Sequence, residues 1–140
     1  MGIRIGAGTG EIRVVLDAAA GAADRFAARE LAAALGQMCG RRVGTGVRAA
    51  PAGGVSLLLG AAADRAADPE APPLAEDEID VAQVGPAALA LRGGGPRGPL
   101  YAVCEVLEAL GVLWYHPGVT VIPRRSSVTL PGRLRARPAF

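Results

Sequence analysis

The residues best suited to chemistry gather in one short segment, residues 114–116. Trp114, Tyr115 and His116 stand together there and include the only tryptophan and the only histidine of the chain. Aromatic side chains with a polar edge are typical of sugar-binding surfaces and of protein interfaces. A histidine without a cysteine nucleophile or a carboxylate beside it is weak evidence for catalysis. The sequence favours Trp114 in the core, with Tyr115 and His116 leading into a turn; an interface at all three residues is the alternative.

A glycine-rich segment, residues 93–98, offers a second kind of site. It contains Arg97 and joins a predicted strand to a predicted helix, where free backbone N–H groups and the helix dipole attract anions. The chain has no lysine, so the usual phosphate-binding loop is absent. A tight connection that only glycine can make is the favoured interpretation, and an anion- or nucleotide-binding loop is the alternative.

The paired acidic residues and the two cysteines are weaker evidence for a catalytic site. Glu105 and Glu108 lie three positions apart on one predicted helix and therefore share a face. Glycosidases place their two carboxylates across a cleft, so a solvated stripe is the favoured interpretation of this pair. Cys39 and Cys104 fall on different predicted helices, and two reduced thiols are expected rather than a disulfide.

Composition removes several classes of function. The 140 residues fit one domain, and a net charge of +2 gives no strong attraction to nucleic acid or to a membrane surface. One histidine and two cysteines argue against a zinc site of the usual kind, so no metal and no cofactor are expected. The chain has neither an apolar run of ~20 residues nor a signal peptide. This predicts a cytoplasmic protein, or a secreted one if the sequence begins inside a longer chain.

The elements that must position these residues follow from hydrophobic periodicity. Apolar residues recur every three or four positions over residues 22–39 and 100–110, which predicts two helices. Short alternating or β-branched runs predict strands at residues 3–5, 12–16, 41–47, 55–59, 78–84, 88–92, 112–115, 119–122 and 127–130. Residues 61–77 are expected to form a surface loop with one helical turn near its start, and residues 132–140 a basic tail. The order predicts an α+β fold, a mostly antiparallel mixed sheet of about five to seven strands with two helices packed on one face.

The two predicted helices carry more apolar surface than one sheet can cover. Residues 100–110 contain only two charges, and apolar residues occupy about two thirds of the circumference of this helix. Alanines coat the outer side of residues 22–39, which lets another backbone approach closely. Nothing else in the chain can supply a second cover, so the sequence predicts a partner, either another domain or another chain.

Several motifs resemble one family of domains. Residues 93–108 read GGGPRGPLYAVCEVLE, residues 110–118 read LGVLWYHPG, and residues 23–31 read ADRFAAREL. These stretches are similar to the N-terminal non-catalytic α/β domain of glycoside hydrolases, namely β-N-acetylhexosaminidases of family 20 and α-glucuronidases. The closing residues 137–140, RPAF, resemble the point where the family's linker enters its catalytic barrel.

The resemblance implies a supporting role rather than an active site. In the family the catalytic carboxylates lie in the (β/α)8 barrel that follows, so no catalytic residue is assigned to this chain. Residues 1–140 are then expected to be a single accessory domain that buttresses the barrel, with a fold like the second domain of hexosaminidases and residues 132–140 starting the linker. Candidate binding or interface residues are Arg97, Tyr101, Glu105, Trp114, Tyr115 and His116.

Two other functions stay open. A free-standing binding module would cover its helices by self-association, so its partner would be a second copy of itself. An anion- or nucleotide-binding protein would use the loop between Gly93 and Gly98. Carbohydrate is a further expected ligand of residues 114–116, whereas nucleic acid and membranes are not expected as partners.

Overall fold

The computed structural model describes residues 2–116 and 119–137, with the backbone alone at 115 and 116. Its strands are β1 (Gly2–Ile5), β2 (Ile12–Val15), β3 (Val43–Gly46), β4 (Val55–Leu59), β5 (Ile79–Gly85), β6 (Ala88–Gly93), β7 (Leu113–His116), β8 (Val119–Val121), β9 (Val128–Pro131) and β10 (Arg133–Ala136). Its helices are α1 (Ala22–Cys39), α2 (Ala61–Ala66) and α3 (Gly98–Ala109). Among these helices, none combines the length and the apolar character that crossing a bilayer requires.

The centre of the fold is a six-stranded mixed sheet with the order β10-β5-β6-β4-β2-β3. The pairs β6–β4, β4–β2 and β2–β3 are parallel, whereas β5 pairs antiparallel with β6 and with β10. Two antiparallel pairs, β1–β9 and β7–β8, stand apart from this sheet. The predicted α+β fold with a mixed sheet is confirmed. Strands β2 and β3 are parallel because α1 forms the crossover connection between them, whereas a hairpin turn joins only antiparallel strands.

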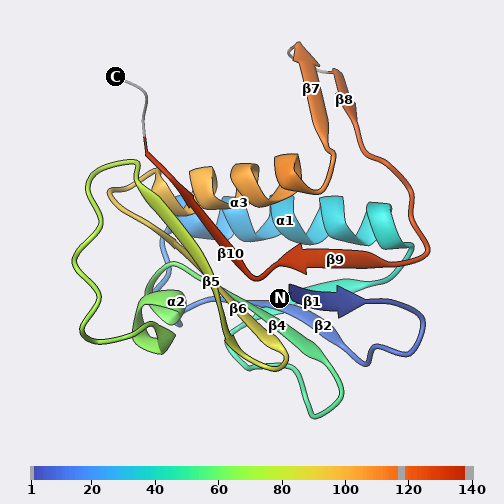
Figure 1. The fold of residues 1–140 in the computed structure, drawn as a ribbon, viewed down its shortest axis with the longest axis horizontal. Helices are drawn as coiled ribbons and strands as arrows, with labels where there is room; N and C mark the ends of the chain where they lie inside the picture. Colours follow the sequence, from blue (N-terminus) through green and yellow to red (C-terminus); the bar gives the residue numbers. More distant parts are fainter. Residues whose placement is uncertain (1, 117–118, 138–140) are drawn as a thin grey trace.

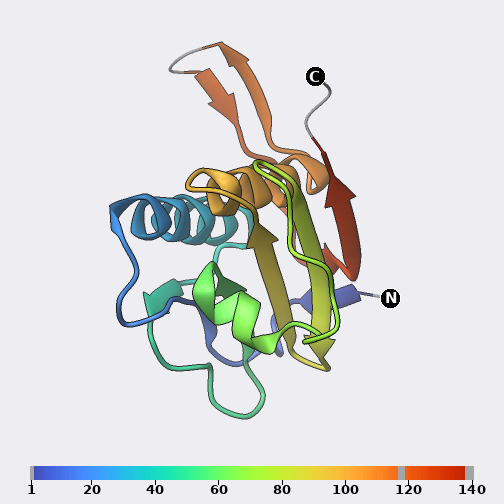
Figure 2. The same cartoon turned by 90° about the vertical axis from the view of Figure 1, so that its left-hand side faces the viewer.

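Helices α1 and α3 lie side by side over one face of the sheet, as predicted for two helices on one face (Figures 1 and 2). Helix α1 has the predicted bounds, and it ends at Gly40, whose φ of 64° provides the left-handed cap. Helix α3 begins two positions earlier than predicted, because Gly98 and Pro99 already belong to its first turn.

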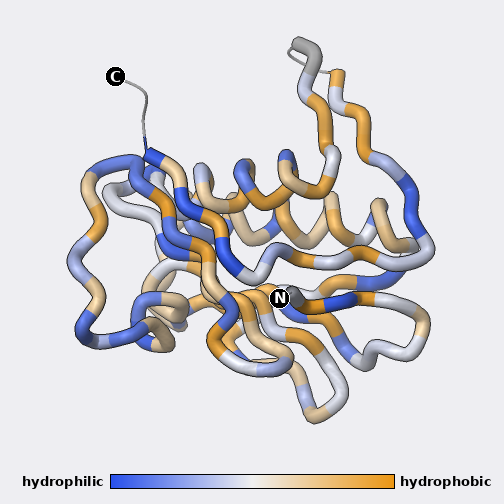
Figure 3. Tube along the Cα trace, viewed as in Figure 1, coloured by the Kyte–Doolittle hydropathy of each residue, from blue (hydrophilic) through white to orange (hydrophobic). Residues whose placement is uncertain are grey.

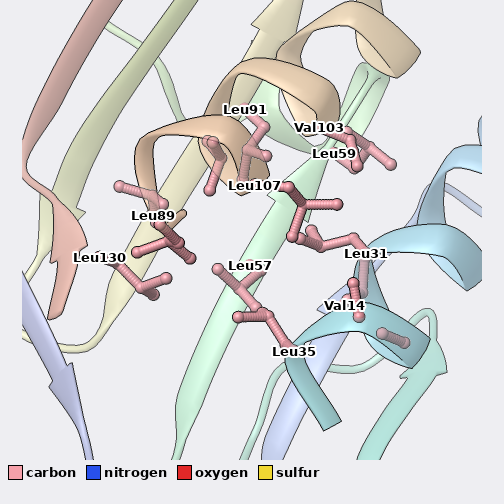
Figure 4. Close-up of a cluster of buried hydrophobic side chains, with 14 of the residues drawn as sticks. Val14, Leu31, Leu35, Leu57, Leu59, Leu89, Leu91, Val103, Leu107 and Leu130 are labelled. Carbon is pink, nitrogen blue, oxygen red and sulfur yellow. The ribbon is translucent and has the colours of Figure 1, made fainter. Parts of the chain in front are cut away.

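The core lies between these helices and the sheet (Figure 4). Leu57 and Leu59 of β4 point into it and are fully buried, together with Leu31 of α1 and Val103 of α3. Strand β4 lies between β2 and β6, and four of its five residues are buried. The near-continuous apolar run of β4 therefore marked a central strand, as the sequence predicted.

Two segments differ from the sequence prediction. The expected loop 61–77 begins with a two-turn helix, α2, in which Ala62 and Ala63 are buried, and only residues 67–78 lack helix and strand. The expected tail 132–140 forms strand β10 over Arg133–Ala136. Its Arg-Leu-Arg-Ala pattern alternates with period two, as a half-buried edge strand does, and this alternation outweighs its charge.

A buried carboxylate holds β10 to the sheet. Asp80 of β5 is 8% exposed, and its carboxylate oxygens lie 3.2 Å from the guanidinium of Arg133 and 3.5 Å from that of Arg135. Arg92 of β6 lies 3.6 Å from the same carboxylate and 3.2 Å from Asp64 of α2. The neighbours of Asp80 and Arg92 in each strand face the core, so this cluster points to the opposite face of the sheet.

Candidate functional site

The outward surface of α1 and α3, together with the hairpin β7–β8, forms a distinct face of the molecule, which we call the helix face. An apolar groove of about 300 Å³ runs between the two helices and is closed at one end by the hairpin. Its lining is mostly apolar: Glu30, Ala33, Ala34, Gln37, Leu100, Val103, Cys104, Leu107, Val112, Trp114, Thr120 and Ile122. The predicted excess of apolar helix surface is therefore present as a groove on the outside of the helices.

The hairpin β7–β8 projects away from the body of the fold in both views (Figures 1 and 2). Leu113 stands opposite Val121, and these side chains are 47% and 45% exposed. The next pair along, Trp114 and Thr120, lines the apolar groove and therefore occupies the other face of the hairpin. Hydrophobic residues follow both strands (Figure 3). A two-stranded hairpin is marginally stable in water, so apolar residues on both its faces point to a missing cover.

The favoured interpretation of Trp114 as a core residue is wrong, since its side chain is 46% exposed at the rim of the apolar groove. The interface alternative agrees with this position. Tyr115 and His116 belong to β7 by their backbone, and their side chains fall outside the described part of the structure.

A second hollow, of about 200 Å³, lies on the other side of α3, and we call it the polar hollow because three of its seven lining residues are charged. It is lined by Asp77, Ile79, Tyr101, Cys104, Glu105, Ala136 and Arg137. The guanidinium of Arg97 lies 5.8 Å from the ring centroid of Tyr101, within the range of a cation–π contact. Two of the predicted residues, Tyr101 and Glu105, thus line this polar hollow, and Arg97 contacts Tyr101 beside it. Trp114 lies apart from them in the apolar groove.

Asp77 is a site residue that the sequence did not single out. It adopts a φ of 63°, its side chain is 11% exposed, and its Oδ2 lies 3.5 Å from the guanidinium of Arg97. The other carboxylate oxygen, Oδ1, is buried without a hydrogen-bond partner among the described residues. The one available signal was its type, because aspartate tolerates the left-handed conformation better than most residues. Its contact with Arg97 depends on the long-range approach of residue 77 to the start of α3.

The glycines of residues 93–98 are explained by close packing. A Cβ on Gly93 would lie 2.0 Å from the carbonyl carbon of Gly98, and a Cβ on Gly94 would lie 1.9 Å from the carbonyl oxygen of Ala75. The N–H of Gly94 donates to the carbonyl of Glu78. These contacts support the favoured interpretation, a tight strand-to-helix connection, and Arg97 beside it already pairs with Asp77.

Both cysteines are free thiols, as expected, and Cys104 lines both hollows. Burial raises the pKa of the Cys104 thiol, and the nearby carboxylates of Glu105, Glu30 and Glu108 raise this pKa further. Cys104 is therefore protonated at neutral pH and is a poor nucleophile. No group of three or more potential metal ligands occurs among the side chains that the structure describes. The helix face is thus suited to binding an apolar partner with a polar rim.

Comparison with known proteins places the fold. No family model matches the chain, and no curated protein matches it. A family GH115 4-O-methyl-α-glucuronidase with specificity for decorated arabinogalactans superposes with a TM-score of 0.74 at 13% identity, over 96% of this chain and 18% of that one. Two structures of Streptomyces plicatus β-hexosaminidase give TM-scores of 0.53 and 0.52 at 19% identity, over 92% of this chain and 23% of theirs. The fold predicted from the motifs is confirmed, and the chain spans less than a quarter of each of these glycoside hydrolases.

Proposed function

We propose that this chain is the non-catalytic accessory domain of a carbohydrate-active enzyme, and that its helix face buttresses a catalytic (β/α)8 barrel. The observation that carries the proposal is the hairpin β7–β8, which is apolar on both faces and stands beside an apolar groove. Covering Leu113, Trp114 and Val121 would contribute about 1 kcal/mol each, since each is roughly half exposed. The likeness to short parts of two kinds of glycoside hydrolase supports the class of the partner.

The path of the chain agrees with a barrel that follows in sequence. Strand β10 leads to Ala136 and Arg137, and both residues line the polar hollow beside α3. Strand β10 ends on the same side of the molecule as the hairpin (Figure 1), so a segment that continues the chain would start beside the helix face. Trp114 at the rim would lie at the junction with the barrel, where an aromatic ring can also stack on a sugar.

The test uses the two cysteines as reporters of coverage. Cys39→Ser leaves Cys104 in the hollows of the helix face, and Cys104→Ser leaves Cys39 near the end of α1, outside both hollows. Each variant is treated with excess iodoacetamide in two proteins. One is the chain alone, and the other is the longer protein encoded when the gene is expressed past the codon of Phe140. We expect labelling of Cys104, and not of Cys39, to slow at least about tenfold in the longer protein.

Three outcomes contradict the proposal. The first is a reading frame that stops at Phe140, and the second is equal labelling of Cys104 in the two proteins. The third is enzyme-like hydrolysis of aryl glycosides by the chain alone, because an accessory domain has no turnover of its own. Light scattering that shows a dimer of the chain alone, together with slow iodoacetamide labelling of Cys104 in that dimer, would identify a second copy of the chain as the cover in place of a barrel.

A further inference from the structure

A cleft of about 780 Å³ follows strand β3, at the edge of the sheet that lies away from β10. We call it the β3 cleft. It is lined by Glu11, Ile12, Arg13, Arg41, Arg42, Gly44, Thr45, Gly46, Val47 and Arg48. Four arginines and one glutamate give this cleft a positive charge, in a chain whose net charge is only +2. It shares no lining residue with the hollows of the helix face.

Two of the four arginines already have partners within the chain and two are available. Arg41 donates to the backbone carbonyls of Gly6, Thr9 and Gly10 at 2.7 to 2.8 Å. Arg13 pairs with Glu11 at 2.7 Å. Within residues 2–116 and 119–137, no carboxylate pairs with Arg42 or Arg48, and both residues are exposed. The electrostatics therefore favour an anionic occupant.

The free side of β3 presents backbone hydrogen-bonding groups. The N–H of Leu16 donates to the carbonyl of Gly46 at 2.8 Å, so Gly46 faces β2. Because strand residues alternate, the N–H and C=O of Thr45 face away from β2, where the described residues supply no further strand. Space is open as well: a Cβ on Gly46 would meet nothing within 4 Å, and one on Gly44 would meet only Arg13, at 4.0 Å. The glycines thus leave the sheet face beside this edge uncrowded.

We propose that the β3 cleft binds an extended acidic peptide segment, which adds to the sheet as a strand beside β3. The free N–H and C=O groups supply the backbone pairing, and Arg42 and Arg48 supply charge at the two ends of the strand. Arg42 directly precedes β3 and Arg48 lies in the bend that follows it, and the four residues of β3 span roughly 13 Å, so carboxylates near both ends of a short extended segment meet these arginines. A second copy of this chain fits poorly, because pairing β3 with β3 brings two arginine sets together.

The test titrates the whole chain with a blocked seven-residue peptide of alternating valine and glutamate, followed by the amide NMR shifts of the protein. We expect saturable binding that weakens with salt, and slower hydrogen exchange of the Thr45 amide by at least about tenfold. Arg42→Ser with Arg48→Ser should weaken binding about fivefold, whereas Arg135→Ser on β10, at the opposite edge of the sheet, should not change it. Thr45→Pro removes the outward N–H and should weaken binding about tenfold relative to Thr45→Val, which keeps it.

Each contrary outcome overturns a definite part of the proposal. Equal binding by Thr45→Pro and Thr45→Val would show that charge acts alone and that no strand is added. Tighter binding of a galacturonic acid trimer than of the acidic peptide would identify an anionic saccharide as the occupant. If Thr45→Pro does not fold, as judged by circular dichroism, the exchange rate of the Thr45 amide in the unsubstituted chain decides, and an unchanged rate rejects strand addition.

Discussion

At the scale of single residues, the burial of Asp24 determines how its carboxylate ionises and how closely the chain packs around it. Asp24, in the first turn of α1, packs so closely on Gly60 that a Cβ there would lie 2.7 Å from its Oδ2. Burial raises the pKa of Asp24, and the neighbouring carboxylate of Asp64 raises it further. The sequence put Arg97, Tyr101 and Glu105 forward as binding or interface candidates within the motif of residues 93–108. It missed Asp77 and misplaced Trp114 because burial is set by distant segments.

Replacing Asp24 by asparagine should make stability less dependent on pH. Since the folded-state pKa is raised, the contribution of Asp24 is full below its ordinary pKa and is lost as pH rises through the raised pKa. Asparagine does not ionise, so the stability advantage of Asp24→Asn over the unsubstituted chain should grow between about pH 3.5 and pH 7. Urea unfolding at both pH values measures this difference. An advantage that stays constant or shrinks would contradict the assignment.

Adding one methyl group at Gly94 should damage the fold, because its Cβ would lie 1.9 Å from the backbone oxygen of Ala75. Gly94→Ala is expected to lower the free energy of unfolding by about 3 kcal/mol. Gly85→Ala is the matched control, since a Cβ there meets nothing within 4 Å, and its effect should stay within about 1 kcal/mol. Equal effects of the two substitutions in urea unfolding would reject the packing explanation for this loop.

Helices and strands were predictable where one periodicity governs a segment. Helix α1 was predicted with its observed bounds, because its apolar stripe is uninterrupted and Gly40 ends it. Strand β10 was missed because its arginines suggested a solvated tail, and only their pairing with Asp80 explains their place at the sheet. The parallel arrangement of β2, β3 and β4 was also missed, since strand partners are chosen by tertiary packing rather than by local sequence.

Removal of the Asp80 carboxylate should loosen β10 before the rest of the sheet. Asp80→Ala leaves Arg92, which is itself largely buried, without one of its two partners, and should lower the free energy of unfolding by about 3 kcal/mol. Amide hydrogen exchange should quicken most at Leu134 and its neighbours in β10. Glu11→Ala, which breaks an exposed pair with Arg13, serves as the control and should cost under about 1 kcal/mol. Uniform exchange across all strands would contradict the anchoring role.

The complete fold explains why the sequence implied a partner. Two helices covered on one side by their sheet still present a groove on the other side, and the hairpin beside it is apolar on both faces. This excess was visible in the pattern of residues 100–110. The shape of the surface and the role of the hairpin were not visible, because they depend on how β7 and β8 leave the body of the fold.

Polar substitutions in the hairpin should separate folding from association. Leu113→Ser with Val121→Ser should change the free energy of unfolding of the chain alone by under about 1 kcal/mol, because both side chains are half exposed. If a barrel domain follows, as we propose, the same pair should lower the affinity for that domain, supplied as a separate polypeptide, at least about tenfold. Leu57→Ala in the core is the converse control and should cost about 2 to 5 kcal/mol of stability. A hairpin variant that binds normally would remove the hairpin from the interface.

The two-sided apolar hairpin also bears on how such a protein is made in the cell. If a catalytic domain follows in the gene, the hairpin leaves the ribosome first. Its apolar side chains then stay exposed to solvent while several hundred further residues are translated, which takes on the order of tens of seconds or longer. During that interval its exposed apolar strands can associate with other nascent chains. Premature termination after this region would then yield a correctly folded fragment that depends on chaperones for its solubility.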